Sequence, residues 1–211
     1  MERVHGWMLV CSVMVFGCDR RPPEPSPIVV SAPRVASSAG HVSGDKAAAD
    51  GRKEPERCMV PMAPEATKVP PPAGAQCPAD PVFGGVKLPR GEVTFLAGSD
   101  GSTVEVELAT SPHQRERGLM YRRSMPENVG MLFAFEEPRV QTFWMHNTCI
   151  PLDMLFIARD GFIAGIVENA PTLNDDGRSV ACPVAYVLEL NAGFARRHGV
   201  KPGQYVKLPG E

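Results

Sequence analysis

Six polar side chains in the second half of the chain lie within or beside apolar runs, where a polar group needs a hydrogen-bond partner or a ligand. They are Arg117, His146, Asn147, Asp153, Glu189 and Asn191. With Trp144, which lies two residues before His146, they form our predicted set of ligand-binding candidates. A structural role is the alternative. Arg117 could pair with Asp153 or Glu189, and Asn147 could satisfy the backbone groups of a turn.

Methionines near these residues suggest a second kind of chemistry. Thioether and imidazole ligands suit Cu(I), and the candidates for such a metal site are Met120, Met145 and His146. The ring of Trp144 could also cover a cation. The alternative is that these methionines fill an irregular apolar core.

Nucleophilic catalysis has little support in the sequence. The serines of the second half lie in predicted turns, and none occupies a Gly-x-Ser-x-Gly nucleophile elbow. The glycines form no phosphate-binding loop. We therefore predict no catalytic residue and no cofactor, and a hydrolase-type enzyme is kept only as an alternative.

The amino terminus is typical of an exported lipoprotein. Met8 to Phe16 is an almost wholly apolar run, too short to span a bilayer as a helix but suited to a signal peptide. The run ends in Val15-Phe16-Gly17-Cys18, which resembles the bacterial lipobox. This predicts a signal peptide over residues 1–17 and a lipid anchor on Cys18. The chain would then be held on the periplasmic or outer side of a membrane.

Four further cysteines follow, an even number in an oxidising compartment, which indicates disulfides. They are Cys58, Cys77, Cys149 and Cys182. Three pairings are possible. We favour Cys58–Cys77 and Cys149–Cys182, because each pair joins cysteines of the same predicted unit. A zinc site is disfavoured, since no Cys-x-x-Cys pair occurs and no histidine is spaced with these cysteines as a ligand.

Composition divides the chain near Arg90. Of the 22 prolines 14 precede it, whereas only three of the 14 aromatic residues do. A segment with so few aromatic side chains cannot bury enough apolar surface to offset its ordering entropy. We predict a disordered tether over residues 18–89 and one globular domain over residues 90–211.

Charge argues against a nucleic-acid partner. Residues 90–211 carry 12 Lys and Arg against 15 Asp and Glu, and no basic stripe occurs. The expected partners are a membrane, through the lipid anchor, and a small molecule, glycan or protein.

Two hairpins are predicted in the domain. Residues 92–97 and 103–109 alternate apolar and polar side chains around a Gly-Ser-Asp-Gly turn. Residues 153–159 and 162–167 flank Asp160-Gly161, a signal for a type I′ turn.

Ser111 followed by Pro112 predicts the start of a short helix that Gly118 ends. Residues 193–198 predict another short helix, and residues 171–183 a polar loop. Further strands are expected at 131–135, 141–145, 186–190 and 204–208. The fold class is therefore mainly β: a compact antiparallel β-sandwich or barrel with one or two short helices.

Four strings of residues resemble the bacterial and archaeal family called domain of unknown function 192. They are GLMYRRSMPENVGMLFAF (118–135), FWMHNTCIPLDMLFI (143–157), a DG turn with VENAPT (160–172) and YVLELNAGFARRHGVKPGQ (186–204). The Trp-Met-x-Asn-Thr-x-Ile-Pro-Leu-Asp string and the Val-Leu-Glu-x-x-Ala-Gly string are quite specific to this family.

The resemblance implies a small β-rich fold, frequent export and no assigned activity. One departure is His146, since the family usually has lysine after Trp-Met. The resemblance and the candidate residues named above together predict an envelope-anchored, non-catalytic ligand-binding or interaction module. The alternatives are a Cu(I)-handling periplasmic protein and a hydrolase.

Overall fold

The computed structural model of the chain describes residues 57–65, 67–82, 86–96 and 101–210. The chain divides into two units, Met1–Gly51 and Arg52–Glu211, and all described residues belong to the second. The predicted signal peptide, Cys18 and the tether up to residue 56 therefore lie outside the described residues. Within the described part, no helix is long and apolar enough to cross a bilayer.

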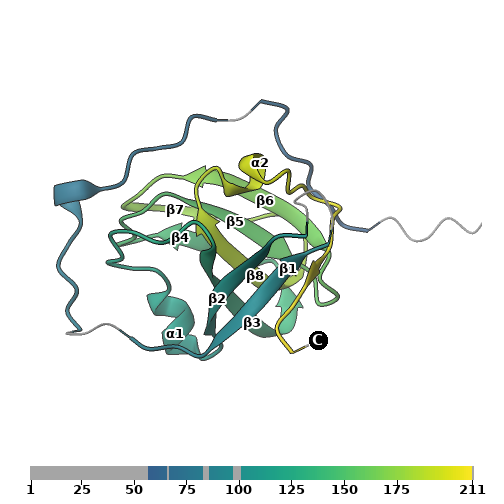
Figure 1. Cartoon of the computed structure of the whole chain (residues 1–211), viewed down its shortest axis with the longest axis horizontal. Helices are drawn as coiled ribbons and strands as arrows, with labels where there is room; N and C mark the ends of the chain where they lie inside the picture. The colour runs from purple at the N-terminus through teal and green to yellow at the C-terminus, as the bar shows by residue number, and fades with distance from the viewer. Residues whose placement is uncertain (1–56, 66, 83–85, 97–100, 211) are drawn as a thin grey trace, which may run out of the picture. The chain divides into compact units, whose positions relative to one another are not determined.

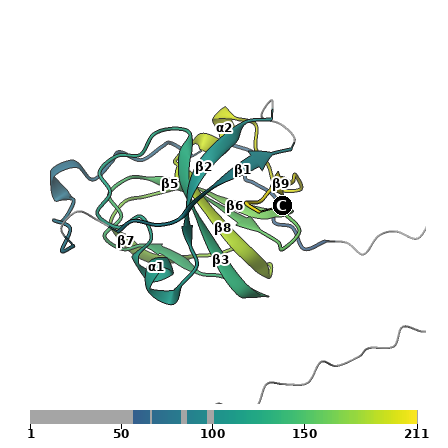
Figure 2. The same cartoon turned by 60° about the horizontal axis from the view of Figure 1, so that its bottom comes forward.

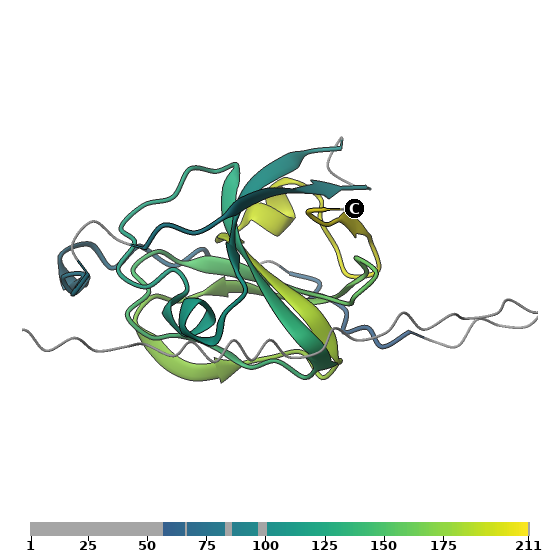
Figure 3. The ribbon, with the colours of Figure 1, turned by 90° about the horizontal axis from the view of Figure 1, so that it is seen from below.

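The described residues form nine strands in two sheets. Seven strands make one sheet in the order β6-β5-β8-β3-β2-β1-β9, and β4 and β7 make a second. The larger sheet curls into a half-barrel (Figures 2 and 3), which confirms the mainly β class. The strands are β1 (Arg90–Phe95), β2 (Thr103–Ala109), β3 (Val129–Arg139), β4 (Phe143–Met145), β5 (Leu152–Ile157), β6 (Ile163–Ala170), β7 (Asn174–Arg178), β8 (Val184–Asn191) and β9 (Val206–Lys207). The helices are η1 (Gly74–Gln76, 3-10), α1 (Pro112–Arg117) and α2 (Phe194–Arg197).

α1 begins and ends as its capping residues predict. The Ser111 hydroxyl accepts a hydrogen bond from the N–H of Gln114, whose side chain accepts one from the N–H of Ser111. This reciprocal pair satisfies two N–H groups that a helix start otherwise leaves without partners. Gly118 ends the helix with a φ of 47°, and its N–H donates to the Gln114 carbonyl.

β2 and β3 run parallel, a local difference from the predicted antiparallel arrangement. The chain leaves β2, passes through α1 and returns to begin β3 at the same end, and only such a crossover can join parallel neighbours. The other neighbouring strands of the large sheet are antiparallel. The crossover places α1 beside β3, as the view along the helix in Figure 3 shows.

The central strands bury both of their faces. Rows of register partners across β3, β8 and β5 belong alternately to two cores. Leu132, Leu188 and Leu155 form a row in one core. The next row, Phe133, Val187 and Phe156, lies in the other core. Side chains two residues apart in a strand share a face. Glu189 of β8 therefore lies on the same face as Val187, inside the second core.

The turn between β5 and β6 differs from the predicted type I′ turn. A type I′ turn needs positive φ at both central residues, but of Asp160 and Gly161 only Gly161 has it, at 82°. The Gly161 N–H donates to the Ala158 carbonyl, and the Ala158 N–H donates to the Phe162 carbonyl. This is a type I turn followed by a left-handed glycine. The predicted hairpin itself is confirmed.

The predicted polar loop 171–183 contains a strand, β7, which pairs with β4. Phe143 faces Arg178 and Met145 faces Asn174 in this pairing. The sequence of β7, Asn-Asp-Asp-Gly-Arg, has no apolar alternation, so its extended form depends on hydrogen bonds to β4. The pairing positions the residues that follow β4.

Residues 57–65 and 67–82, here called the strap, run along the outside of the sheets (Figure 1). The Val60 N–H donates to the Ala164 carbonyl at 2.7 Å, and the Ala73 N–H donates to the Cys149 carbonyl at 2.9 Å. The prediction of a tether up to residue 89 is therefore wrong for the strap. A segment without aromatic side chains cannot readily form its own core, but backbone bonds to an existing domain can still order it.

Both disulfides join the strap to the sheets. They are Cys58–Cys182 and Cys77–Cys149, with Cα atoms 5.6 and 5.3 Å apart. The predicted pairs Cys58–Cys77 and Cys149–Cys182 are wrong, because they assumed two separate units, whereas the strap carries its cysteines to two different points on the domain. The bridges span 124 and 72 residues, and in the chain-entropy model each stabilises the fold by about 4–5 kcal/mol.

These two bridges predict a specific peptide map. Digestion of the non-reduced, alkylated protein is expected to release peptides joining Cys58 to Cys182 and Cys77 to Cys149, identified by mass spectrometry. Limited proteolysis of the same sample is expected to leave a core that begins before Cys58. After reduction, cleavage should occur within residues 59–76, because the strap then has only hydrogen bonds and surface contacts to hold it. A dominant peptide joining Cys58 to Cys77 would contradict the described pairing.

Candidate ligand-binding site

A cavity of about 220 Å³ opens between α1, the β3–β4 connection and β8. Four of the predicted candidates line it: Arg117, Trp144, His146 and Glu189. The other lining residues are Arg115, Glu116, Gly118, Leu119, Met120, Phe133, Phe135, Gln141, Thr142, Phe143 and Thr148. The structure thus brings residues from both ends of the domain sequence to one place.

Glu189 is a buried carboxyl group with no partner. Only 4% of the residue is exposed, and on either side its register partners are Met131 of β3 and Met154 of β5. No hydrogen bond or ion pair joins its side chain to any described residue. Burial in these surroundings raises the pKa of Glu189 from its ordinary 4.5 to about 8. At neutral pH the group is therefore mainly a neutral acid, which can donate as well as accept a hydrogen bond.

Gln141 is a second buried polar group that lacks a partner in the same cavity. It lies in the connection between β3 and β4 and is 6% exposed. Its amide Nε2 has no hydrogen-bond partner among the described residues. Because buried polar atoms are nearly always hydrogen-bonded, two such groups lining one cavity are unusual.

Phenylalanine rings form the apolar part of the cavity. Phe143 packs edge-on against Phe133, with ring centroids 4.9 Å apart, and against Phe135 at 6.3 Å. It also packs edge-on against Phe156 of β5, at 6.2 Å. Edge-to-face packing of this kind fixes ring positions, so the cavity has a defined apolar wall.

Two arginines of α1 line the cavity, and both are held in place. Arg115 donates to the carbonyl groups of Ala134 and Thr110, and its guanidinium lies over the ring of Phe135. Arg117 donates to Asp80 of the strap at 2.6 Å. This ion pair lowers the pKa of Asp80. The alternative in which Arg117 pairs with Asp153 or Glu189 is therefore wrong, because the carboxylate that pairs with Arg117 belongs to the strap.

Trp144 and His146 form the rim. Trp144 is 49% exposed, and its ring lies 5.2 Å from that of His146. The Nδ1 atom of His146 lies 2.8 Å from a carboxylate oxygen of Asp175 in β7. The β4–β7 pairing therefore orients the imidazole through this bond, since Asp175 and His146 lie next to the paired residues Asn174 and Met145.

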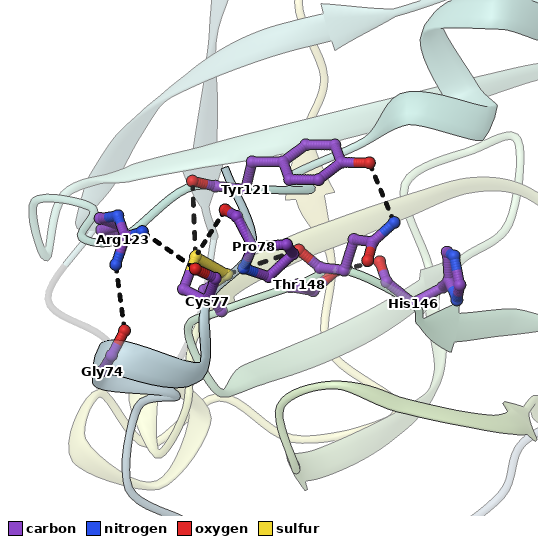
Figure 4. The surroundings of a disulfide bond; sticks show 9 residues. Gly74, Cys77, Pro78, Tyr121, Arg123, His146 and Thr148 are labelled. Atoms are coloured by element: carbon purple, nitrogen blue, oxygen red, sulfur yellow. Dashed lines mark hydrogen bonds between the residues drawn. A yellow bond between two sulfur atoms is a disulfide. The ribbon is translucent and has the colours of Figure 1, made fainter. Parts of the chain in front are cut away.

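Asn147 shapes the backbone below the rim without lining the cavity. Its φ is 51°, a left-handed conformation that asparagine tolerates. Its Nδ2 donates to the Tyr121 hydroxyl at 3.0 Å (Figure 4). Figure 4 also shows the strap at this point, where Arg123 donates to the carbonyl groups of Gly74 and Cys77. The Cys77–Cys149 bridge therefore stabilises the turn that carries His146.

Asp153 and Asn191 bond the backbone elsewhere and do not line the cavity. The Asp153 carboxylate accepts hydrogen bonds from the N–H groups of Asn169, Gly193 and Ala195. Burial raises the pKa of Asp153, while these three donors lower it, and the net direction is upward. Asn191 Nδ2 donates to the Met125 and Pro126 carbonyls. Both side chains therefore hold loops to the sheet.

The three copper candidates occupy different environments. Met145 is fully buried in the core, whereas Met120 and His146 line the cavity. Among the described residues, no group of three or more His, Cys, Asp and Glu side chains could hold a metal ion.

Sequence reasoning missed Gln141, Arg115 and the phenylalanines of the cavity wall. Gln141 directly precedes the run Thr-Phe-Trp-Met, so the same criterion of a polar residue beside an apolar run could have selected it. Nothing in the sequence around Asp80 indicates its pairing with Arg117, which depends on the course of the strap.

Comparison with known proteins gives a family and a fold. The family model DUF192, described as "Uncharacterized ACR", matches residues 94–208. No curated protein matches the chain.

Two solved structures are similar to this one. One, from Sinorhizobium meliloti 1021 and described as a candidate transcription regulator, is 50% identical with a TM-score of 0.56. The match covers 59% of this chain and 97% of that chain. The other, a protein of unknown function from Novosphingobium aromaticivorans DSM 12444, is 35% identical with a TM-score of 0.56. It covers 64% of this chain and 95% of that chain.

The burial of Glu189 predicts a pH-dependent cost to stability. Between its unfolded pKa of 4.5 and its folded pKa of about 8, the native state keeps a proton that the unfolded chain releases. The free energy of unfolding therefore falls as the pH rises through this interval and levels off above it. The substitution Glu189→Gln removes this dependence. Its stability relative to the wild type is expected to rise by roughly 4 kcal/mol between the two ends of the interval.

Urea denaturation at several pH values measures this difference. Glu116→Gln is the matched control, because Glu116 is an exposed carboxyl group that lines the same cavity, and its difference from the wild type should stay flat. If the difference in stability between Glu189→Gln and the wild type does not change with pH, Glu189 ionises normally in the folded protein, and the prediction is wrong.

Proposed function

Because the chain belongs to the DUF192 family, whose members are uncharacterised, we propose a function on the basis of the cavity described above. We propose that this cavity is the binding site of a small-molecule ligand. The observation that carries the proposal is that Glu189 and the Gln141 amide line one cavity, both buried and without a side-chain hydrogen-bond partner among the described residues. An unpartnered buried polar group destabilises a fold by about 1–3 kcal/mol. A ligand that bonds to both groups accounts for their presence.

The placement of the family motifs supports the proposal. Three of the strings that carry the resemblance contribute to the cavity lining: the first through Gly118 and Phe133, the second through Trp144 and His146, and the last through Glu189. The cavity is also braced from outside, since the Arg117–Asp80 pair ties α1 to the strap. Ligand sites are commonly preformed, mainly apolar hollows with a few placed polar groups.

We further propose that the protein acts outside the cytoplasm, anchored through Cys18. The two disulfides support this, since disulfides persist mainly in oxidising compartments. The formal charge of residues 90–211, 12 Lys and Arg against 15 Asp and Glu, does not favour DNA as a partner. The proposal therefore does not adopt the regulator role by which the Sinorhizobium protein is described.

The anchor is tested by Cys18→Ser. The variant is expected to lose incorporation of labelled fatty acid and to move from the membrane fraction to the soluble fraction, because acyl chains supply the membrane affinity. Cys11→Ser, within the predicted signal peptide, is the control and should keep both properties. Unchanged membrane retention of Cys18→Ser without label would contradict the anchor.

Binding in the cavity is tested by NMR on the full chain with labelled methionine methyl groups. The probes are benzoate, benzamide, benzylamine, glucose and Cu(I). At least one organic probe is expected to shift the resonances of Met120 and Met131, near the cavity, and to leave that of Met59 in place. Glu189→Met, which fills the cavity with an apolar chain, should abolish the shift. A response to Cu(I) alone would favour the metal-handling alternative, and no response to any probe would contradict the proposal.

A further inference from the structure

Resting on the proposed function, we infer that the ligand is a small carboxylic acid with an apolar body. Its carboxylate would lie between Glu189 and the Gln141 amide, and its body against Phe133 and Phe143. Neither the family description nor the descriptions of the similar structures assign a class of ligand to this cavity.

Hydrogen-bond donors predominate among the polar groups of the cavity. The Gln141 Nε2 has two N–H groups and no partner. Arg115 adds N–H donors and a positive charge from α1, whereas the charge of Arg117 is balanced by Asp80. A neutral Glu189 adds an O–H. A ligand that presents oxygen acceptors satisfies this set, whereas a ligand rich in donors leaves it unsatisfied.

The charges around the cavity do not repel an anion. Arg117 is paired with Asp80 of the strap, so the charges of Arg115 and Glu116 remain on α1 and balance each other. His146, after β4, carries no net negative charge in either form, and its Nδ1 lies beside Asp175. Among the described residues, the only carboxyl groups that line the cavity are Glu116, which is exposed, and the buried Glu189.

The neutral form of Glu189 favours an anionic ligand over a cationic one. The strands on either side place Met131 and Met154 beside it, and neither can titrate. With its pKa raised to about 8, Glu189 presents a neutral acid at pH 7. A neutral acid can share its proton with a ligand carboxylate, in a short charge-assisted hydrogen bond. Binding an ammonium group would instead require Glu189 to lose that proton.

The apolar wall fits the body of such an acid. Phe143 and Phe133 meet edge-on at 4.9 Å, and the cavity of about 220 Å³ limits the ligand to a small molecule. Trp144 at the rim is half exposed and can cover an apolar body once the ligand is bound.

Three probes of nearly equal shape separate the possibilities: benzoate, benzamide and benzylamine. Their affinities for the full chain, with both disulfides formed, are measured by the Met120 and Met131 methyl shifts from pH 6.5 to pH 9. Benzoate is expected to bind at least tenfold more tightly than the other two at pH 6.5. Its affinity should fall about tenfold by pH 9, because only the fraction of protein with protonated Glu189 binds it.

Four variants test which side chains bind benzoate and which one causes the pH dependence. Glu189→Gln keeps an N–H donor without a titrating proton, so benzoate affinity should stay within about threefold of the wild type at pH 6.5 and no longer fall by pH 9. Gln141→Leu removes the other donor and should weaken benzoate about tenfold at every pH. Glu137→Gln, which changes an exposed carboxyl group outside the cavity lining, is the control and should keep the wild-type fall. His146→Gln tests the rim imidazole and should also keep the fall.

The results that overturn the inference differ from those that overturn the proposed function. Tighter binding of benzylamine, or an affinity for benzoate that rises with pH, contradicts a carboxylic acid but keeps the cavity as a binding site. Equal binding of benzoate and benzamide also contradicts it. No shift with any probe contradicts the binding function itself. If Glu189→Gln does not fold, the wild-type pH profile and probe order decide alone.

Discussion

β8 hydrogen bonds to β3 along one edge and to β5 along the other. Because successive side chains of a strand point to opposite faces, the side chains of β8 alternate between two buried cores. The cores, the curl of the large sheet and the position of the cavity follow from these two pairings. They also place Glu189 between Met131 and Met154, neither of which can donate a hydrogen bond to its carboxyl group. A fold selected for stability alone would have an apolar side chain there, since a buried polar group without a partner destabilises it.

The strap performs for this domain what an additional layer of secondary structure does in others. It has little regular structure and no aromatic side chain, yet two disulfides and scattered hydrogen bonds hold it to the sheets. Through Asp80 it fixes Arg117, and through Cys77 it holds the turn before Ile150. Loss of the bridges would therefore affect the cavity wall as well as the stability of the whole unit.

The candidate site shows which side chains sequence reasoning can identify. A polar residue beside an apolar run is usually buried, and this criterion led to Arg117, His146 and Glu189, which line the cavity, but also to Asp153 and Asn191, which bond the backbone. Burial can be read from neighbours in the sequence. Whether a buried side chain has a partner depends on what lies opposite it in space. Three N–H groups bond to the Asp153 carboxylate, whereas nothing in the described structure bonds to the side chain of Glu189.

The sequence by itself determined the local elements: the β1–β2 hairpin, the Ser111 cap and Gly118 end of α1, and the β5–β6 hairpin. Each depends on residues a few positions apart, whose side-chain alternation and backbone preferences act locally. Only the tertiary structure decided the parallel β2–β3 pairing, the strand in residues 174–178, the disulfide partners and the order of the strap. Each of these joins segments far apart in the chain. Their contacts form because the sheet brings the segments together, and no local pattern specifies that meeting.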